Sequence, residues 1–271
     1  MLLTLAVLLA CGGGLSEADK HYAAGEALAA AGEFQRSLEE FDQAIQLDPR
    51  NPDAYIARGN NYDRFGAYAR AIQDYDQAIA LEPDDPNIYF DRAVSYSNLR
   101  EYQLAVDDYG RAIELSPDFA GAYINRGIIY RDLGYFEDAI ADFGQAVRIN
   151  PNDAASYFDR AYSQAAVNLP ELAAENYTQA IRINPGFADA YSNRGLIYIN
   201  LGDNVRAIAD LNEAIRLNPE LAPAYVNRAW ANATLGREKE TLEDIKRAEE
   251  LGVEQEVIDR IQEVLKKALE S

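Results

Sequence analysis

The chain has few of the side chains from which most active sites and metal centres are built. Its 271 residues include one cysteine, Cys11, and one histidine, His21. A disulfide framework, or a zinc site of several thiolates or imidazoles, therefore cannot form within it. A catalytic relay through histidine would depend on His21 alone, and we interpret His21 as a packing or surface residue. The composition predicts a protein without enzyme activity, cofactor or bound metal.

Positive charge is also scarce. The chain carries 25 lysine and arginine residues against 45 aspartate and glutamate residues, which gives a formal net charge of -20 at pH 7. Such a chain repels the phosphates of nucleic acids, whose binding normally requires a basic face. Hydrophobic residues make up 48% of the chain, too many for a disordered protein. We expect a folded protein that excludes nucleic acid and attracts basic or hydrophobic partner segments.

The apolar run at the start of the chain is too short to cross a membrane. Residues 1–10 carry no charge, but a spanning helix needs roughly twenty apolar residues. The run ends in the sequence LLAC, closed by Cys11, and three glycines follow. This pattern resembles the signal peptide and lipobox of bacterial lipoproteins. The resemblance implies that residues 1–10 are removed, that Cys11 carries a lipid anchor, and that residues 11–17 form a flexible tether.

This resemblance also implies a location. A lipid on Cys11 would anchor the protein in the bacterial cell envelope, facing outside the cytoplasm, and would be its one contact with the membrane. If the leader is not a signal, the protein is cytoplasmic.

Prolines recur at a fixed spacing through the rest of the chain. They stand at positions 49, 83, 117, 151, 185 and 219, each 34 residues after the one before. A constant period of this length indicates a tandem array of structural repeats. In the fourth unit, two runs with helical spacing are separated by Leu133-Gly134 and closed by Pro151, because proline cannot continue a helix. We predict an all-α array of helical hairpins with seven units, at residues 18–51, 52–85, 86–119, 120–153, 154–187, 188–221 and 222–253.

Aromatic and small residues recur at the same places in these units, numbered from the first residue of each. The recurring residues are tyrosines at position 4 (Tyr55, Tyr89, Tyr123, Tyr157, Tyr191 and Tyr225), glycine or alanine at position 8 (Gly59, Ala93, Gly127, Ala161, Gly195 and Ala229) and aromatics at position 24 (Phe41, Tyr75, Tyr109, Phe143 and Tyr177). Small residues let helices approach closely while aromatics fill the gaps. This pattern resembles the tetratricopeptide repeat family, which implies a right-handed superhelical solenoid of helix-turn-helix repeats. Residues 254–271 form one further amphipathic helix, which we interpret as a capping helix.

Charged residues recur in step with the repeat. Position 7 is arginine in units two to seven, and position 23 is aspartate in all of these except unit five, where it is asparagine. Because a partly buried guanidinium requires a carboxylate, we predict a ladder of ion pairs between first and second helices, within a unit or across to its neighbour. The arginines are Arg58, Arg92, Arg126, Arg160, Arg194 and Arg228, and the residues at position 23 are Asp74, Asp108, Asp142, Asn176, Asp210 and Asp244.

The family resemblance also implies a candidate binding surface. In tetratricopeptide arrays the first helices line a concave groove, and apolar side chains stand at its positions here beside aspartate and asparagine. An exposed apolar strip commonly marks a protein-binding surface, and an asparagine amide can pair with both sides of a peptide group. We predict that the groove binds an extended or helical peptide segment of a partner protein; alternatively, part of the strip packs under a neighbouring helix. The groove residues are Phe90, Asp91, Val94, Ile124, Asn125, Ile128, Phe158, Asp159, Tyr162, Asn193, Leu196, Val226, Asn227 and Trp230.

Three functions are compatible with these features. We favour a non-enzymatic protein–protein interaction scaffold, lipid-anchored outside the cytoplasm and acting in the assembly of cell-envelope complexes. The second is a cytoplasmic adaptor or co-chaperone, although the groove lacks the lysine with which family members grip the C-terminal carboxylate of chaperones. The third is an enzyme that uses carboxylates alone. We disfavour it because adjacent pairs such as Asp107-Asp108 on a helix do not converge on one point.

Overall fold

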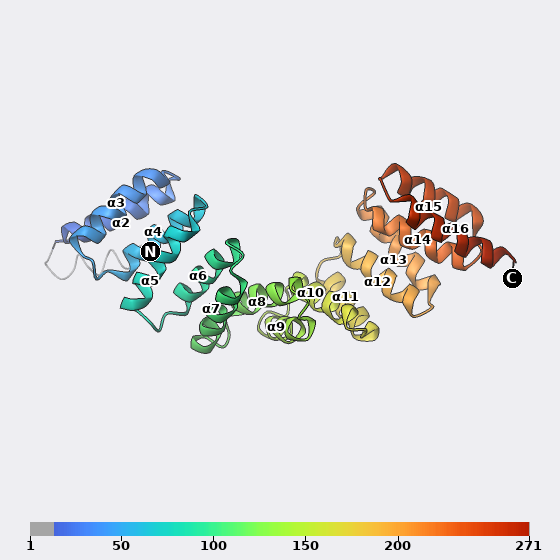
Figure 1. Cartoon of the computed structure of the whole chain (residues 1–271), viewed down its shortest axis with the longest axis horizontal. Helices are drawn as coiled ribbons and strands as arrows, with labels where there is room; N and C mark the ends of the chain where they lie inside the picture. The colour runs from blue at the N-terminus through green and yellow to red at the C-terminus, as the bar shows by residue number, and fades with distance from the viewer. Residues whose placement is uncertain (1–13, 271) are drawn as a thin grey trace. The chain divides into compact units, whose positions relative to one another are not determined.

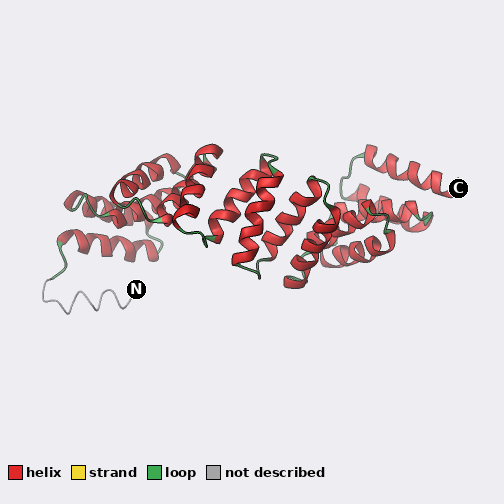
Figure 2. Ribbon diagram, turned by 90° about the horizontal axis from the view of Figure 1, so that it is seen from below, coloured by secondary structure: helices red, strands yellow, loops and turns green. Residues whose placement is uncertain are grey.

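A computed structural model of the chain describes residues 14–270, and all regular structure in this range is α-helical (Figures 1 and 2). The expected signal peptide and Cys11 lie outside the described residues. The chain divides into two compact units, Met1–Ala122 and Tyr123–Ser271, and each is described by itself. Within residues 14–270, no helix combines the length and the apolar composition needed to pass through a lipid bilayer.

The first unit is built from helical hairpins, drawn from blue to green in Figure 1. Each first helix packs along the second helix of its own hairpin, and α4 and α6 also pack against the second helix of the hairpin before them. The helices are α2 (Glu17–Ala30), α3 (Phe34–Leu47), α4 (Pro52–Arg64), α5 (Tyr68–Leu81), α6 (Pro86–Asn98) and α7 (Tyr102–Leu115).

The second unit continues the same hairpins and ends in an additional helix, α16 (Gln255–Glu270). The hairpin helices are α8 (Ala120–Asp132), most of which lies in this unit, α9 (Phe136–Ile149), α10 (Ala154–Ala166), α11 (Pro170–Ile183), α12 (Ala188–Asn200), α13 (Asn204–Leu217), α14 (Ala222–Thr234) and α15 (Glu238–Glu250).

Side-chain caps and prolines begin several first helices. Asn51, Asp85 and Asp153 precede α4, α6 and α10, and each accepts a hydrogen bond from a backbone N–H of the first turn, at 3.4, 2.8 and 3.2 Å. These caps satisfy donors that have no partner within the helix. Pro52 and Pro86 then occupy the first position of α4 and α6, where proline loses no hydrogen bond.

The turn inside each hairpin requires a residue with a left-handed backbone. Gly134 has a φ of 82° at this place, a conformation that only glycine adopts at little cost. The equivalent residues of the third and fifth repeats are Arg100 and Asn168, with φ values of 63° and 59°. Asparagine tolerates this region better than arginine does, so the turn in the third repeat carries a local steric cost.

Close contact between a small and a large residue forms the centre of each hairpin. A Cβ atom on Gly59 would lie 2.8 Å from Cε1 of Tyr75, and one on Gly195 would lie 2.8 Å from Cγ of Leu211. Alanine takes this place in the third repeat, where Ala93 is completely buried. The recurring small residues at position 8 therefore allow the two helices of a hairpin to approach closely.

The recurring tyrosines at positions 24 and 4 differ in their burial. Those at position 24, such as Tyr75, are fully buried in the core. Those at position 4, such as Tyr123, are half-buried, apart from Tyr225, which is buried. The position-24 tyrosines are therefore core residues, whereas the position-4 tyrosines, such as Tyr55, Tyr157 and Tyr191, pack at the edge of the core.

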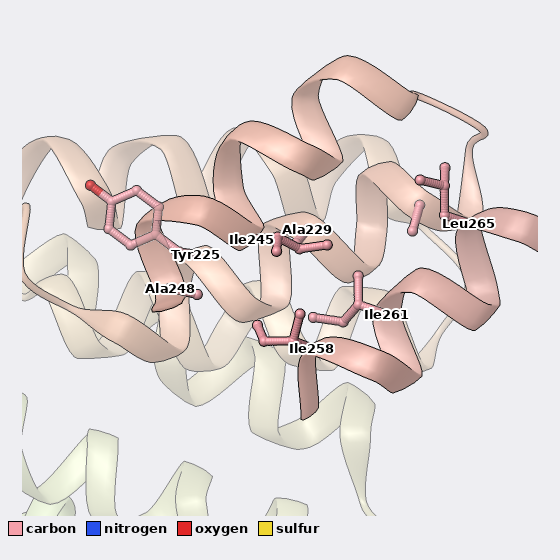
Figure 3. Close-up of a cluster of buried hydrophobic side chains, with 8 residues drawn as sticks. Tyr225, Ala229, Ile245, Ala248, Ile258, Ile261 and Leu265 are labelled. Atoms are coloured by element: carbon pink, nitrogen blue, oxygen red, sulfur yellow. The ribbon is translucent and has the colours of Figure 1, made fainter. Parts of the chain in front are cut away.

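Helix α16 covers the apolar end of the second unit (Figure 3). Ile258, Ile261 and Leu265 are buried in one cluster with Tyr225 and Ile245 of the last hairpin. Full burial of an isoleucine side chain stabilises a fold by about 1.5–3 kcal/mol. The helix acts as the expected cap.

Candidate functional site

Five of the six position-7 arginines pair with an aspartate sixteen residues later, on the second helix of the same hairpin. Arg126 donates from Nε and Nη2 to the two carboxylate oxygens of Asp142, with both distances at 2.8 Å. This bidentate geometry is the strongest form of an arginine–carboxylate contact. The side chain of Asp142 is 6% exposed, so water screens the pair weakly. The pairs are Arg58–Asp74, Arg92–Asp108, Arg126–Asp142, Arg194–Asp210 and Arg228–Asp244.

The half-buried tyrosines of the first helices cover these guanidinium groups. The Cζ of Arg126 lies 5.9 Å from the ring centroid of Tyr123 and 5.8 Å from that of Tyr130. A cation within about 6 Å of a ring face is attracted to its π electrons. The guanidinium therefore lies over tyrosine rings while aspartate binds its edge.

Some of the arginines also reach the preceding hairpin. Nη1 of Arg58 donates to Asp42, and Nη1 of Arg92 donates to Asp76, both at 2.6 Å. A neutral oxygen takes this place for Arg194, whose Nη1 donates to the hydroxyl of Thr178 at 2.8 Å. One guanidinium can thus join three helices.

The first and fifth repeats depart from the ladder. In the first, where alanine replaces the arginine, Glu40 instead pairs with Nδ1 of His21 at 2.7 Å. In the fifth, Asn176 and Gly144 stand where acidic residues bind the arginines of other repeats. Within residues 14–270 no carboxylate pairs with Arg160, and its buried Nε has no hydrogen-bond partner. The predicted ladder is therefore interrupted at Arg160, because the neutral amide of Asn176 does not replace a carboxylate.

The predicted groove residues differ in their exposure. Tyr162 and Leu196 are 48% and 40% exposed. The remaining ones are half-buried, and Val226 and Trp230 pack against the cluster that α16 closes. Part of the predicted apolar strip is therefore covered by the fold itself. The half-buried residues are Phe90, Asp91, Val94, Ile124, Asn125, Ile128, Phe158, Asp159, Asn193, Val226, Asn227 and Trp230.

In the first unit, the predicted groove contains an acid in an unfavourable environment. Burial, followed by the charges of Asp63 and Asp85, raises the pKa of Asp91 from 3.8 to about 6. The neighbouring Phe90 stacks on Phe119 with 4.8 Å between ring centroids. In the described part of this unit no lysine or arginine forms an ion pair with Asp91. A cationic group from outside would therefore stabilise its charged form.

In the second unit, two cavities meet at Tyr162 and Asn193. The first has a volume of about 650 Å³ and also contains Phe158 and Asp159. The second has a volume of about 360 Å³ and also contains Leu196. The structure thus brings together five predicted groove residues from α10 and α12. We refer to the walls of these two cavities as the Tyr162 surface.

Two contacts position the polar groups of the Tyr162 surface. Nη1 of Arg131 donates to Asp159 at 2.5 Å. Burial raises the pKa of Asp159, and the Arg131 charge opposes that rise. Burial raises the pKa of the core tyrosine Tyr177, and the side chain of Asn193 opposes that rise. The amide of Asn193 therefore lies beside the hydrophobic core.

The cavity walls also contain residues that the sequence did not single out. Among these are Arg131, Phe136 and Asn168, at the end of a first helix, the start of a second helix and a turn. The isolated positive charge of Arg131 is a signal that could have found it. Phe136 and Asn168 lie outside the first helices, where the repeat pattern gives no such pointer.

Paired helices repeat along the chain, and their first helices carry a surface of aromatic and amide side chains. These features define a helical-repeat interaction protein. The chain belongs to the tetratricopeptide repeat family, because family models cover more than half of it. Models described as tetratricopeptide repeat match residues 86–119, 120–153 and 188–221, and one described as TPR repeat matches residues 25–64, 65–99 and 171–202.

Solved structures of such proteins share the fold. A tetratricopeptide repeat protein from Parabacteroides merdae is 23% identical with a TM-score of 0.62, covering 93% of this chain and 99% of that one. The C-terminal part of a TPR repeat-containing protein from Cytophaga hutchinsonii is 15% identical with a TM-score of 0.72, covering 88% and 98%. YrrB, described as a TPR protein with an unusual peptide-binding site, is 23% identical with a TM-score of 0.62, covering 68% and 95%. No curated protein matches the chain significantly.

Proposed function

We propose that this protein is a non-enzymatic scaffold that binds a peptide segment of a partner protein on the Tyr162 surface. The meeting of two cavities at Tyr162 and Asn193 carries this proposal. An exposed tyrosine offers a large apolar face with little loss of side-chain entropy on binding. Beside it, the amide of Asn193 can pair with a peptide backbone. The peptide-binding site of YrrB supports the same use of a related fold.

The bound segment contains basic and apolar residues. The chain carries a formal net charge of -20, which attracts cationic segments and repels anionic ones. Leu196 and Phe158 offer apolar contacts in the second unit.

Selection from a displayed library of random peptides, followed by fluorescence anisotropy with the selected peptides, tests this proposal. We expect Tyr162→Glu and Leu196→Glu to weaken binding at least tenfold. Leu242→Glu is the matched control, because Leu242 on α15 is 46% exposed and lies outside both cavities. Unchanged binding in the two groove variants, or an equal loss in the control, would refute a binding role for this surface.

We further propose that a lipid on Cys11 anchors the scaffold outside the cytoplasm, where it takes part in the assembly of cell-envelope complexes. The LLAC sequence and the glycines after it support this localisation. Metabolic labelling with a clickable palmitate should mark the wild-type protein but not Cys11→Ser. An unlabelled wild type would instead support a cytoplasmic adaptor.

A further inference from the structure

Arg160, at which the arginine ladder is interrupted, lines a third cavity in the second unit. This cavity has a volume of about 620 Å³, and Arg160, Gln164, Asn176 and Tyr198 are among the residues that line it. It shares no lining residue with the Tyr162 surface. A ligand here would therefore occupy a separate site.

Neither of the two acids that bind arginines in other repeats is present at the equivalent positions around Arg160. Asn176, in place of the aspartate, directs its Nδ2 to Gln164 Oε1 at 2.8 Å and to the backbone oxygen of Leu172 at 2.9 Å. Gly144, in place of the second acid, has no side chain, and a Cβ built on it would still lie 3.9 Å from Cζ of Arg160. Within the described chain, the buried Nε of Arg160 is left without an acceptor. An oxygen that reached it would satisfy an orphaned donor.

The intact repeats show which chemistry fits such a guanidinium. In the next repeat, Nε and Nη2 of Arg194 both donate to Asp210, each at 2.8 Å. A planar group with two oxygens matches the two parallel N–H bonds of the guanidinium edge. We propose that the cavity at Arg160 binds a carboxylate supplied by a ligand, in the place that aspartate fills in the other repeats.

The other charges in the cavity favour a carboxylate over phosphate. Glu171 and Glu175 are exposed residues of the same lining, and they repel a dianion more than a monoanion. Arg206 also lines the cavity, but its Nε is paired with Asp203 at 2.6 Å and its guanidinium lies 4.4 Å from the ring centroid of Tyr198. Arg160 is therefore the cation that the ligand engages. The carboxylate belongs to a free organic acid or to an acidic side chain of a peptide.

Nuclear magnetic resonance of the full chain tests the site through the Nε–Hε signal of Arg160, assigned with Arg160→Lys. The probes are sodium propionate, an acetylated and amidated Gly-Gly-Glu-Gly-Gly peptide, its glutamine counterpart and inorganic phosphate, each at matched ionic strength. We expect a saturable shift with propionate or the glutamate peptide, and none with the glutamine peptide. A response to the peptide alone would identify a side-chain carboxylate, and a response to propionate would identify a free acid. The signal of Arg126, which Asp142 already binds, should stay unchanged.

Two variants should block the site by giving Arg160 a carboxylate from the protein itself. Asn176→Asp restores the acid found in the five intact repeats, and Gly144→Asp supplies one from the preceding helix. Each should weaken the response to the carboxylate probes at least tenfold. Full binding in both folded variants, no saturable shift with either carboxylate, or stronger binding of phosphate would overturn the proposal.

Discussion

Removal of one partner from an intact ladder pair should destabilise the second unit markedly. Arg126→Leu leaves Asp142 charged and unpaired at a place where its side chain is 6% exposed. Loss of one partner of a fully buried pair costs about 3–5 kcal/mol. Because the Arg126 side chain is 20% exposed, we expect the lower end, about 3 kcal/mol. In the double variant with Asp142→Leu, no buried charge remains, so its loss should be smaller than the sum of the single losses by about 1–3 kcal/mol.

Urea unfolding provides the measurement. Trp230 is the only tryptophan of the chain and lies in the second unit, so its fluorescence follows that unit, while circular dichroism follows all helices. Arg160→Leu, measured without added carboxylate, is the matched control. It removes an arginine that has no ion pair in the described chain and should cost less than Arg126→Leu. A coupling below about 0.5 kcal/mol between Arg126 and Asp142 would show that the ladder does not stabilise the fold.

Three further predictions follow from burial, close packing and the cap. Because the folded-state pKa of Asp91 is raised to about 6, the folded protein binds a proton more readily than the unfolded chain, and the contribution of Asp91 to stability falls as pH rises from about 4 to about 6. Asp91→Asn should remove this dependence and raise the free energy of unfolding at pH 7 by about 1–3 kcal/mol. Urea unfolding at about pH 4 and at pH 7 would detect both effects, and an unchanged pH profile would contradict the raised pKa of Asp91. Gly59→Ala forces a Cβ to within 2.8 Å of Tyr75 and should cost about 1–3 kcal/mol, whereas Gly144→Ala, whose Cβ meets nothing closer than 3.9 Å, should gain up to about 1 kcal/mol. Thermal unfolding should therefore move the two midpoints in opposite directions, and parallel shifts would count against the packing argument. Ile258→Ala should cost about 2–5 kcal/mol and speed amide exchange in α14 and α16; exchange as slow as in the wild type would mean that α16 does not hold the end of the unit closed.

The repeat period predicted the fold because every local signal recurred in step with it. Proline at the end of six units, glycine in five of the seven turns and a small residue at position 8 all indicate the same hairpin. The ladder followed from the co-occurrence of arginine and aspartate, since a partly buried guanidinium requires a partner. The sequence did not determine whether a pair joins helices within a hairpin or between hairpins. The bidentate contact of Arg126 with Asp142 places it within one hairpin.

The candidate site was harder to predict, because exposure depends on packing between repeats. Phe158 stands at a groove position, yet it stacks on Phe187 with 4.8 Å between centroids and is half-buried. Trp230 packs toward the cluster closed by α16. Periodicity identifies the face of a helix on which a residue lies, but the size of neighbouring side chains decides how much of it remains open. Tyr162 and Leu196 remain more exposed than Val94, Ile128 and Trp230, which stand at the same position in other repeats.

Only some hairpins provide a second acid that binds the arginine of the next hairpin, and this difference affects where the array begins to unfold. In a repeat protein, stability is the sum of the stability of each repeat and a coupling term for each junction between neighbours. Asp42 and Asp76 strengthen their junctions through Arg58 and Arg92, whereas the junction between α9 and α10 offers Arg160 the bare backbone of Gly144. At this junction the charge contact comes from another place, because Arg131 of α8 binds Asp159 of α10. Loss of that ion pair should therefore make this junction the first place at which the second unit opens locally.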